Sequence, residues 1–222
     1  MTFTETYTGH VEPGGASATR ELAGLTVAKV SVGGAWDNNA YLLRCIETGA
    51  QLLVDAADEA PRVLAMVGDA GLERVVTTHR HQDHWKALAA VVAATGARTA
   101  AGRDDVDGIP VTTDEPLADG DEIRLGRCVL RVITLAGHTP GSVALRYDEP
   151  GGVPHLWTGD SLFPGGPGKT AGPAEFTSLM DDLETKVFGS MPDETWVYPG
   201  HGDDTTLGVE RPQLPSWRAR GW

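Results

Sequence analysis

The sequence predicts a mixed α/β fold in which helices cover the faces of β-sheet. Between residues 58 and 102, helix-like and strand-like segments alternate, which is the arrangement that packs helices against a sheet. From residue 121 onward, short apolar runs separated by Gly, Pro and Asp turns predict further strands. With 222 residues, the chain is long enough to bury a sizeable core, and we expect a single domain spanning residues 1–222.

The first part of the chain is expected to be rich in strands. Residues 1–22 are polar and turn-rich, which predicts a loose lead-in or an edge hairpin. Alternating or continuous apolar patterns predict strands at residues 25–32, 41–46 and 51–57. Asn38 and Asn39 lie in a gap between two of these runs, and we expect them in a turn rather than against a substrate.

Two helices are expected in the alternating region. Asp58 is the expected N-cap of the first helix, Pro61 suits its first turn, and Gly68 or Gly71 ends it. A buried strand over residues 73–79 then leads into a second helix, and a further strand follows at 97–102. The second helix is expected to leave His84 and to end at Gly96.

The second half is expected to add strands, one helix and a tail. The predicted strands are residues 121–126, 127–135, 141–148, 153–160 and 194–202. A helix is expected from about Ala174 to Phe188, after a loop rich in Gly and Pro. Residues 202–222 form the expected C-terminal tail, in which Trp217 and Trp222 dock onto the domain.

Composition argues against several classes of protein. Acidic residues outnumber basic ones by 31 to 18, so the formal net charge is −13. A surface this negative repels phosphate backbones, and we expect no nucleic-acid partner. No apolar run is long enough to span a bilayer and no secretory signal is visible, so we expect a cytoplasmic protein without membrane association. Cys45 and Cys128 lie in apolar runs and are expected to be buried free thiols.

One stretch gathers an unusual number of metal-binding side chains. Residues 78–84, THRHQDH, hold three of the seven histidines together with an aspartate. His79 and His81 are two residues apart, so in an extended segment both rings point to the same side. Asp83 and His84 follow where the chain turns into a helix, and they would face a neighbouring position. Four ligands on one compact turn suit part of two metal sites better than one.

Further candidate ligands follow other predicted strands, each beside a glycine turn. His138 in LAGHTPG, Asp160 in LWTGDS and His201 in VYPGHG each come directly after a strand. Strand ends are where α/β sheets place their sites, so these side chains are expected near the histidine cluster. His10 and His155 lack such a context, and we assign them no functional role.

These motifs resemble the metallo-β-lactamase superfamily of metal-dependent hydrolases. THRHQDH, GHTPGS, TGDSLF and YPGHG occur in the family's order, and the resemblance runs from about Leu25 to His201. It implies a four-layer αβ/βα sandwich with a dinuclear metal site at one edge. Asp55 in LLVDAA matches the superfamily's first motif, whose aspartate braces the histidine loop through hydrogen bonds and binds no metal.

The resemblance also implies which residues hold the metals. The implied ligands are His79, His81 and His138 for a first ion, Asp83, His84 and His201 for a second, and Asp160 as a bridge between them. Two divalent ions are expected, zinc first, with iron or manganese compatible with the same donors. We expect Asp83 and Asp160 to act in catalysis as well.

Within the superfamily, the chain is most similar to glyoxalase II-like thioesterases (hydroxyacylglutathione hydrolases). The segments DNNAYLL, GDSLFPGGPGKT and PGHGDDTTLGVE resemble segments of that family. Lys169 matches a lysine that grips a carboxylate of the glutathione moiety, whereas Thr170 and Ala171 replace aromatic residues. The chain stops at Trp222, so we expect the family's C-terminal helical domain to be absent. Phe163 either lines the pocket or packs in the core.

The expected activity is hydrolysis of a small-molecule acyl thioester, with a metal-bridging hydroxide as the nucleophile. Metal coordination lowers the pKa of water from about 15.7 to about 7. The first metal would take the developing oxyanion, and the second would receive the departing thiolate, a soft ligand. The acyl group, the thiol carrier and the oligomeric state stay open.

Two alternatives share these motifs. A persulfide dioxygenase-like enzyme would hold one iron on His79, His138 and Asp160, although its usual GCGRTD-type loop reads GGPGKTAG here. A lactonase or other ester hydrolase would use the same dinuclear site. Lactone-cleaving members present a tyrosine near the metals, and the candidates here, all within predicted strands, are Tyr41, Tyr147 and Tyr198. A non-catalytic scaffold is disfavoured by the seven intact ligands.

Overall fold

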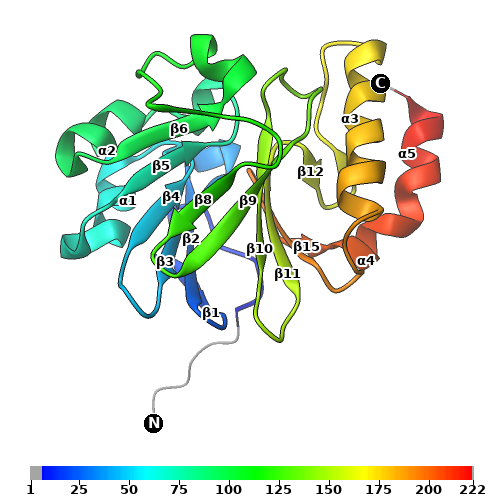
Figure 1. Cartoon of the computed structure of the whole chain (residues 1–222). Coiled ribbons are helices and arrows are strands. Elements are labelled where there is room, and N and C mark those ends of the chain that lie inside the picture. The colour runs from blue at the N-terminus through cyan, green and yellow to red at the C-terminus, as the bar shows by residue number, and fades with distance from the viewer. Residues whose placement is uncertain (1–6, 222) are drawn as a thin grey trace.

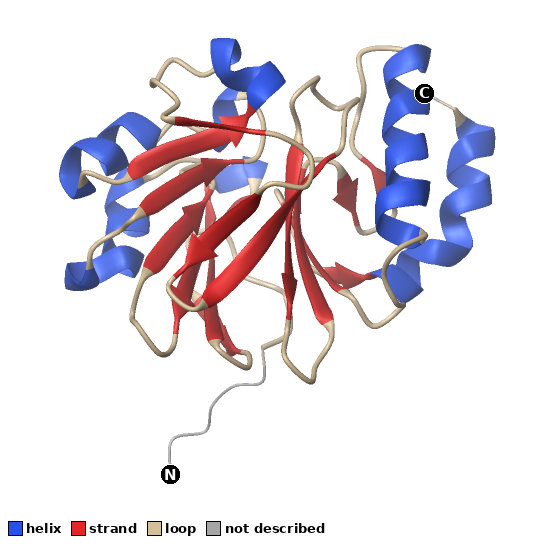
Figure 2. Ribbon diagram, viewed as in Figure 1, coloured by secondary structure: helices blue, strands red, loops and turns tan. Residues whose placement is uncertain are grey.

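Two β-sheets pack face to face and helices cover both outer faces (Figures 1 and 2). The structure is a computed structural model that describes residues 7–221. The order of layers is helix, sheet, sheet, helix, so the predicted four-layer αβ/βα sandwich is confirmed.

The first sheet contains seven strands. Their bounds are β1 Ala18–Glu21, β2 Leu25–Val32, β3 Asn38–Cys45, β4 Gln51–Val54, β5 Arg74–Thr77, β6 Arg98–Gly102 and β7 Glu115–Leu117, and they lie side by side in this order. Neighbours are antiparallel from β1 to β4 and parallel from β4 to β7. Parallel neighbours need crossover connections, which α1 (Ala60–Val67) and α2 (Leu88–Thr95) supply on the outer face.

The second sheet contains six strands in the order β15-β14-β11-β10-β9-β8. Their bounds are β8 Glu122–Leu125, β9 Cys128–Thr134, β10 Val143–Asp148, β11 Pro154–Gly159, β14 Trp196–Pro199 and β15 Thr205–Thr206. A small hairpin, β12 Leu162–Phe163 with β13 Gly166–Pro167, follows β11. The outer face is covered by α3 (Pro173–Asp182), which continues as a π-helical segment over Leu183–Phe188, and by α5 (Leu214–Arg220).

Three apolar layers hold these elements together. The layer between the sheets includes Leu43, Leu52, Leu130 and Trp157, all completely buried. A second layer joins α1 and α2 to the first sheet, and a third joins α3 and α5 to the second sheet. Burying one such side chain stabilises the fold by about 1.5–3 kcal/mol, so these layers give the loops at the sandwich edge a rigid support.

Most predicted strands are present. The strand predicted at residues 25–32 has the same bounds as β2. The predicted helix near 174–188 is α3 with its π-helical continuation. β1 pairs with β2, so the end of the predicted lead-in is an edge hairpin. Both cysteines are buried and free, as predicted. None of the helices within residues 7–221 has the length and apolar character needed to cross a membrane.

Three local expectations are wrong. Glu59, not Asp58, occupies the N-cap of α1, and the Asp58 carboxylate instead accepts the Glu59 N–H at 2.7 Å. The second helix starts at Leu88 rather than at His84, because residues 82–84 form a separate 3₁₀ turn. Asn38 and Asn39 begin β3 rather than lying in a turn, and both are buried.

The C-terminal tail has more structure than predicted. It contains β15, the short helix α4 (Leu207–Glu210) and α5. Trp217 is buried, with its ring 6.2 Å from the Phe188 ring, so the predicted docking of this tryptophan is confirmed. Trp222 lies outside the described residues.

Candidate metal centre

The predicted ligands all lie at one edge of the sandwich, in loops that follow strands. His79, His81, Asp83 and His84 follow β5, His138 lies between β9 and β10, Asp160 follows β11, and His201 follows β14. The two sheets are linked here, because Asn38 of β3 forms a β-bridge with His201. The Asn39 N–H also donates to the Gly200 carbonyl at 2.7 Å. The backbone therefore fixes the distance between loops that come from different sheets.

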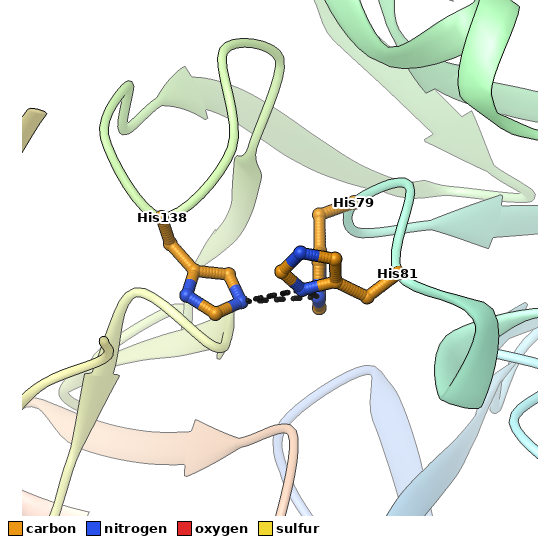
Figure 3. Close-up of side chains that lie close together, drawn as sticks. All are labelled: His79, His81 and His138. Carbon is orange, nitrogen blue, oxygen red and sulfur yellow. Dashed lines mark hydrogen bonds between the residues drawn. The ribbon is translucent and has the colours of Figure 1, made fainter. Parts of the chain in front are cut away.

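Three histidine nitrogens converge in the first group (Figure 3). His81 Nδ1 lies 3.0 Å from His79 Nε2 and 2.9 Å from His138 Nε2. The distance between His79 Nε2 and His138 Nε2 is 3.3 Å. A neutral imidazole has one N–H, so three such nitrogens cannot all be satisfied by one another. A tetrahedral ion with Zn–N bonds of about 2.0–2.1 Å separates its ligand nitrogens by about 3.3 Å. The arrangement suits a metal ion at its centre.

The second group combines a carboxylate with two histidines. His201 Nε2 lies 3.3 Å from both Asp83 Oδ2 and His84 Nε2, and the latter two atoms are 3.8 Å apart. Mixed nitrogen and oxygen donors at these separations again suit a divalent ion such as zinc. The structure thus brings the same two sets of three residues together that the sequence comparison divided between two ions.

Asp160 lies between the two groups. Its Oδ1 is 3.2 Å from His84 Nε2, and its Oδ2 is 3.5 Å from His138 Nε2 and 3.4 Å from His201 Nε2. Oδ1 is buried, and no hydrogen-bond partner satisfies it among the described residues. Gly200 makes this approach possible, because a Cβ there would lie 2.2 Å from Oδ1. A buried carboxylate that lacks a donor and faces both groups suits a place between two cations.

Hydrogen bonds at the far side of the rings set which nitrogen faces the site. His84 Nδ1 lies 2.8 Å from the Asp55 carboxylate. His138 Nδ1 lies 2.6 Å from the Lys169 carbonyl, and His201 Nδ1 lies 2.7 Å from the Trp36 carbonyl. These oxygens can only accept a hydrogen bond, so Nδ1 carries the proton and the Nε2 lone pair is free for a metal. The second nitrogen of each ring is therefore prepared for coordination.

Asp55 connects the end of β4 to the histidine loop. Its Oδ1 accepts the Thr78 N–H at 2.7 Å, and its Oδ2 accepts the Thr78 hydroxyl at 2.8 Å as well as the His84 Nδ1 proton. Its backbone is left-handed, with φ of 58°. This side chain faces the rear of His84 rather than the converging donor atoms, so it orients the ring.

Two residues that sequence reasoning missed hold the ligand loops. Asn38 Nδ2 donates to the backbone carbonyl and the carboxylate of Asp83, both at 3.1 Å, and lies 3.4 Å from His201 Nε2. Asp105 is completely buried and accepts the backbone N–H groups of Arg80 and Gly141, each at 2.9 Å. Asp105 thereby joins the histidine loop to the loop that carries His138.

The charges of these side chains support one another. Burial holds the pKa of His79 well below its usual value. Burial also lowers the pKa of His84, but the Asp160 and Asp55 carboxylates outweigh it and raise that pKa well above normal. Burial opposes ionisation of Asp160, yet the His84 charge keeps the Asp160 pKa well below its usual value. Burial likewise opposes the charge on His201, but Asp160 and Asp83 raise its pKa to about 10. A divalent ion would replace these protons as the partner of the carboxylates.

The rim of the site carries the remaining predicted residues. The Phe163 ring lies 6.1 Å from the His201 ring, so Phe163 lines the site. Lys169 is exposed, and together with Phe176 and Arg220 it lines a cavity of about 240 Å³ beside the His138 loop. The three candidate tyrosines have other partners. Tyr41 donates to the Pro199 carbonyl inside the core, Tyr147 donates to the Ala23 carbonyl, and Tyr198 stacks on Trp157.

The fold and the clustered His and Asp donors define an αβ/βα-sandwich protein with a centre for divalent metal ions. A family model described as the metallo-beta-lactamase superfamily matches residues 33–201. The chain therefore belongs to the metallo-beta-lactamase superfamily.

Individual relatives agree with this assignment. A hydroxyacylglutathione hydrolase from Polaromonas sp. (strain JS666 / ATCC BAA-500) is 34% identical over 179 residues, which cover 80% of this chain and 66% of that protein. The match thus spans just under two thirds of the relative's length. Among solved structures, ETHE1 from Myxococcus xanthus has a TM-score of 0.70 at 30% identity, covering 81% of this chain and 79% of that one. TTHA1623 in a di-iron-bound form has a TM-score of 0.67 at 31% identity, covering 80% and 94%.

Proposed function

We propose that this chain is a dinuclear metal-dependent hydrolase that cleaves acyl thioesters of small molecules. The observation that carries the proposal is the position of Asp160, whose carboxylate lies 3.5 Å from His138 in one group of three donors and 3.2 Å from His84 in the other. The relative named hydroxyacylglutathione hydrolase supports thioester chemistry. TTHA1623, solved in a di-iron-bound form, supports two ions in one site of this fold.

We assign the ligands as follows: His79, His81 and His138 to one ion, Asp83, His84 and His201 to the other, and Asp160 to both. Divalent ions bound there supply Lewis acidity and lower the pKa of water from about 15.7 to about 7. Zinc suits these nitrogen and oxygen donors, and iron or manganese is compatible with them.

The side chains themselves orient the reactants. The pKa of Asp83 and that of Asp160 both lie below the ordinary range, so both carboxylates accept hydrogen bonds and can orient an attacking water. Asn38 holds Asp83 in place through its amide. Phe163 provides an apolar wall beside His201, which favours an acyl chain over a charged group.

We assign recognition of the thiol carrier to Lys169 and Arg220. Both line the cavity beside the His138 loop, and neither forms an ion pair with any residue in the described part of the chain. In a chain with a net charge of −13, two unpaired cations at one small cavity favour an anionic group such as a carboxylate. Lys169 is therefore the proposed substrate-binding residue, with Arg220 as its partner.

The setting of the enzyme is also part of the proposal. We propose that residues 1–222 act as one domain in the cytoplasm. The free thiols of Cys45 and Cys128 support a reducing compartment.

Metal analysis combined with a thioester panel tests the function. Protein expressed without metal supplementation should contain about two ions per chain and hydrolyse thioesters of carboxylate-bearing thiols. Asp160→Asn should lose at least one ion per chain and most of the activity. Loaded wild-type protein that cleaves no thioester of any carrier would overturn the proposal.

A persulfide dioxygenase-like activity is the alternative with structural support. His138 Nε2 lies 3.3 Å from His79 Nε2 and 3.5 Å from Asp160 Oδ2, which also suits one iron. The similarity to ETHE1 fits this alternative. One iron per chain with oxygen uptake on persulfides would favour it. A lactonase has less support, because Tyr41 and Tyr198 are held in the core.

A further inference from the structure

Both cysteines of the chain lie at the end of the sandwich opposite the metal centre. Cys45 is the last residue of β3, whose first residue, Asn38, contacts Asp83 and His201. Seven residue steps along a strand, at about 3.3 Å each, separate the two ends by about 23 Å. Cys128 begins β9 in the other sheet and belongs to the same buried layer as Cys45. The thiols therefore lie far from the metal centre.

The chain segments that carry the two thiols, one from each sheet, are hydrogen-bonded to each other. The Arg127 N–H, directly before Cys128, donates to Cys45 Sγ at 3.4 Å. The Cys128 thiol donates to the Gly24 carbonyl at 3.1 Å, and the same carbonyl accepts the N–H of Ile46, directly after Cys45, at 3.0 Å. Cys45 thus accepts a hydrogen bond from the backbone directly before Cys128, and the Gly24 carbonyl joins the Cys128 thiol to the backbone directly after Cys45. Their interaction also shows in the pKa of Cys128, which burial and then the neighbouring Cys45 raise.

A cavity of about 610 Å³ leads to this pair. Both cysteines line it, together with Tyr147, Arg127 and Glu47. Its charged side chains are of both signs, so it does not select strongly for a charged reagent. A small molecule can therefore reach the sulfur atoms although both residues are largely buried.

The two thiols differ in reactivity. Burial opposes ionisation of Cys45, but hydrogen bonds from Thr48 and the Arg127 N–H outweigh it and lower the Cys45 pKa to about 6. The Cys128 pKa is raised instead. A pair made of one thiol that ionises at neutral pH and one neighbour that does not is suited to attack by the first and resolution by the second.

We propose that Cys45 and Cys128 form a second reactive site, which exchanges with small-molecule disulfides and closes into a disulfide between the two sheets. The Cys45 thiolate attacks one sulfur of the small disulfide, forms a mixed disulfide and releases one thiolate. Cys128 then loses its proton to solvent and attacks the Cys45 sulfur, and the second small thiolate leaves. Two protein thiols are oxidised and one small disulfide is reduced to two thiols. This inference does not depend on the hydrolase activity.

Intact-mass measurement with hydroxyethyl disulfide, a small neutral reagent, tests the site. Wild-type protein should lose two hydrogens and release two small thiols per chain, without a lasting adduct. Cys128→Ser should retain one adduct on Cys45, because the resolving thiol is gone. Cys45→Ser should react at least tenfold more slowly than Cys128→Ser at neutral pH. Native circular dichroism and reaction of the remaining thiol in denaturant serve as controls for folding and for the reagent.

A measurement on the unmodified protein makes the test independent of the variants. The rate of the first step in wild-type protein, release of the first small thiol, should reach half its maximum near pH 6, because Cys45 supplies the attacking thiolate. Closure of the disulfide should also raise the melting temperature, since it joins two sheets. Two thiols that stay free in native wild-type protein, while reacting readily in denaturant, would overturn the proposal, as would a lasting adduct without closure.

Discussion

His84 Nε2 lies 3.2 Å from Asp160 Oδ1, while the opposite nitrogen of the same ring lies 2.8 Å from Asp55 Oδ2. One buried imidazole is therefore held between two carboxylates, one at the edge of the site and one behind it. The rear carboxylate fixes which nitrogen carries the proton. The front carboxylate marks where a cation is needed. The same histidine ring is thus oriented by Asp55 and turned toward the carboxylate that faces the proposed metal centre.

Asp55→Asn should weaken metal binding without removing a ligand. The amide keeps the size of the side chain but loses the charge that holds the proton on His84 Nδ1. Loss of such an outer partner costs about 10–100-fold in metal affinity. Competition with a chromophoric chelator measures the effect, which should fall mainly on the ion that His84 is proposed to bind.

Asp58→Asn is the matched control for this change. Asp58 lies three residues away, and its carboxylate contacts the Lys86 side chain and the Glu59 N–H, neither of which belongs to a proposed ligand. Its substitution should leave the metal affinity unchanged. Equal metal affinities in Asp55→Asn and Asp58→Asn would refute the orienting role of Asp55.

Asp105→Asn should destabilise the fold around the first group of histidines. The buried carboxylate accepts the N–H groups of Arg80 and Gly141, and an amide in its place turns a donor toward one of them. We expect a loss of about 2–3 kcal/mol in the free energy of unfolding, measured by urea denaturation of metal-free protein. The exposed neighbour provides the control, since Asp104→Asn should change this free energy by less than about 0.5 kcal/mol. Similar free energies of unfolding for both variants would show that the hydrogen bonds of Asp105 to the two loops do not stabilise the fold.

The clustering of the candidate ligands could be predicted from the sequence because each of them carries a local signal. His79, His81, His138 and Asp160 all follow apolar strand patterns and stand beside short polar or glycine turns. Folding brings such strand ends to one edge, so residues distant in the chain share a site. The local signal and the tertiary arrangement agree for these side chains.

Asn38 and Asp105 could not be predicted in the same way. The preference of asparagine for turns favoured a turn at Asn38, whereas pairing with β2 and a bridge to His201 draw it into a strand. Asp105 lies in an acidic stretch that resembles a solvated loop, and its partners are 25 and 36 residues away. The function of both residues depends on long-range contacts that no local pattern contains.

His155 should make the protein sensitive to acid independently of the metal centre. Burial lowers its pKa from 6.5 to about 4, so the unfolded chain binds a proton more readily than the folded one. The resulting stability is complete above pH 6.5 and is lost as the pH falls toward 4, by up to about 3 kcal/mol. Urea denaturation of metal-free protein at several pH values should therefore show a smaller loss over this range for His155→Gln.

The control for acid sensitivity is His10, which lies at the surface. Asp203 and Glu12 raise its pKa, so its contribution has the opposite sign and disappears as the pH rises. His10→Gln should keep the full acid-induced loss of stability. If His155→Gln and wild type lose the same free energy between pH 6.5 and pH 4, the buried imidazole does not set this dependence.

Lys169→Ala should separate recognition of the carrier from chemistry. Lys169 contributes its carbonyl oxygen to His138 and its side chain to the cavity that Arg220 also lines. The substitution keeps the carbonyl, so the orientation of His138 and kcat should be retained. KM should rise about 10- to 100-fold for a thioester whose carrier bears a carboxylate, since a lost charge-assisted hydrogen bond costs about 1.5–3 kcal/mol. KM for an uncharged carrier should not change.

Lys86→Ala, which removes a lysine paired with Asp58, is the control and should leave both KM values unchanged. An equal rise in KM for charged and uncharged carriers would mean that Lys169 does not bind the carboxylate of the carrier.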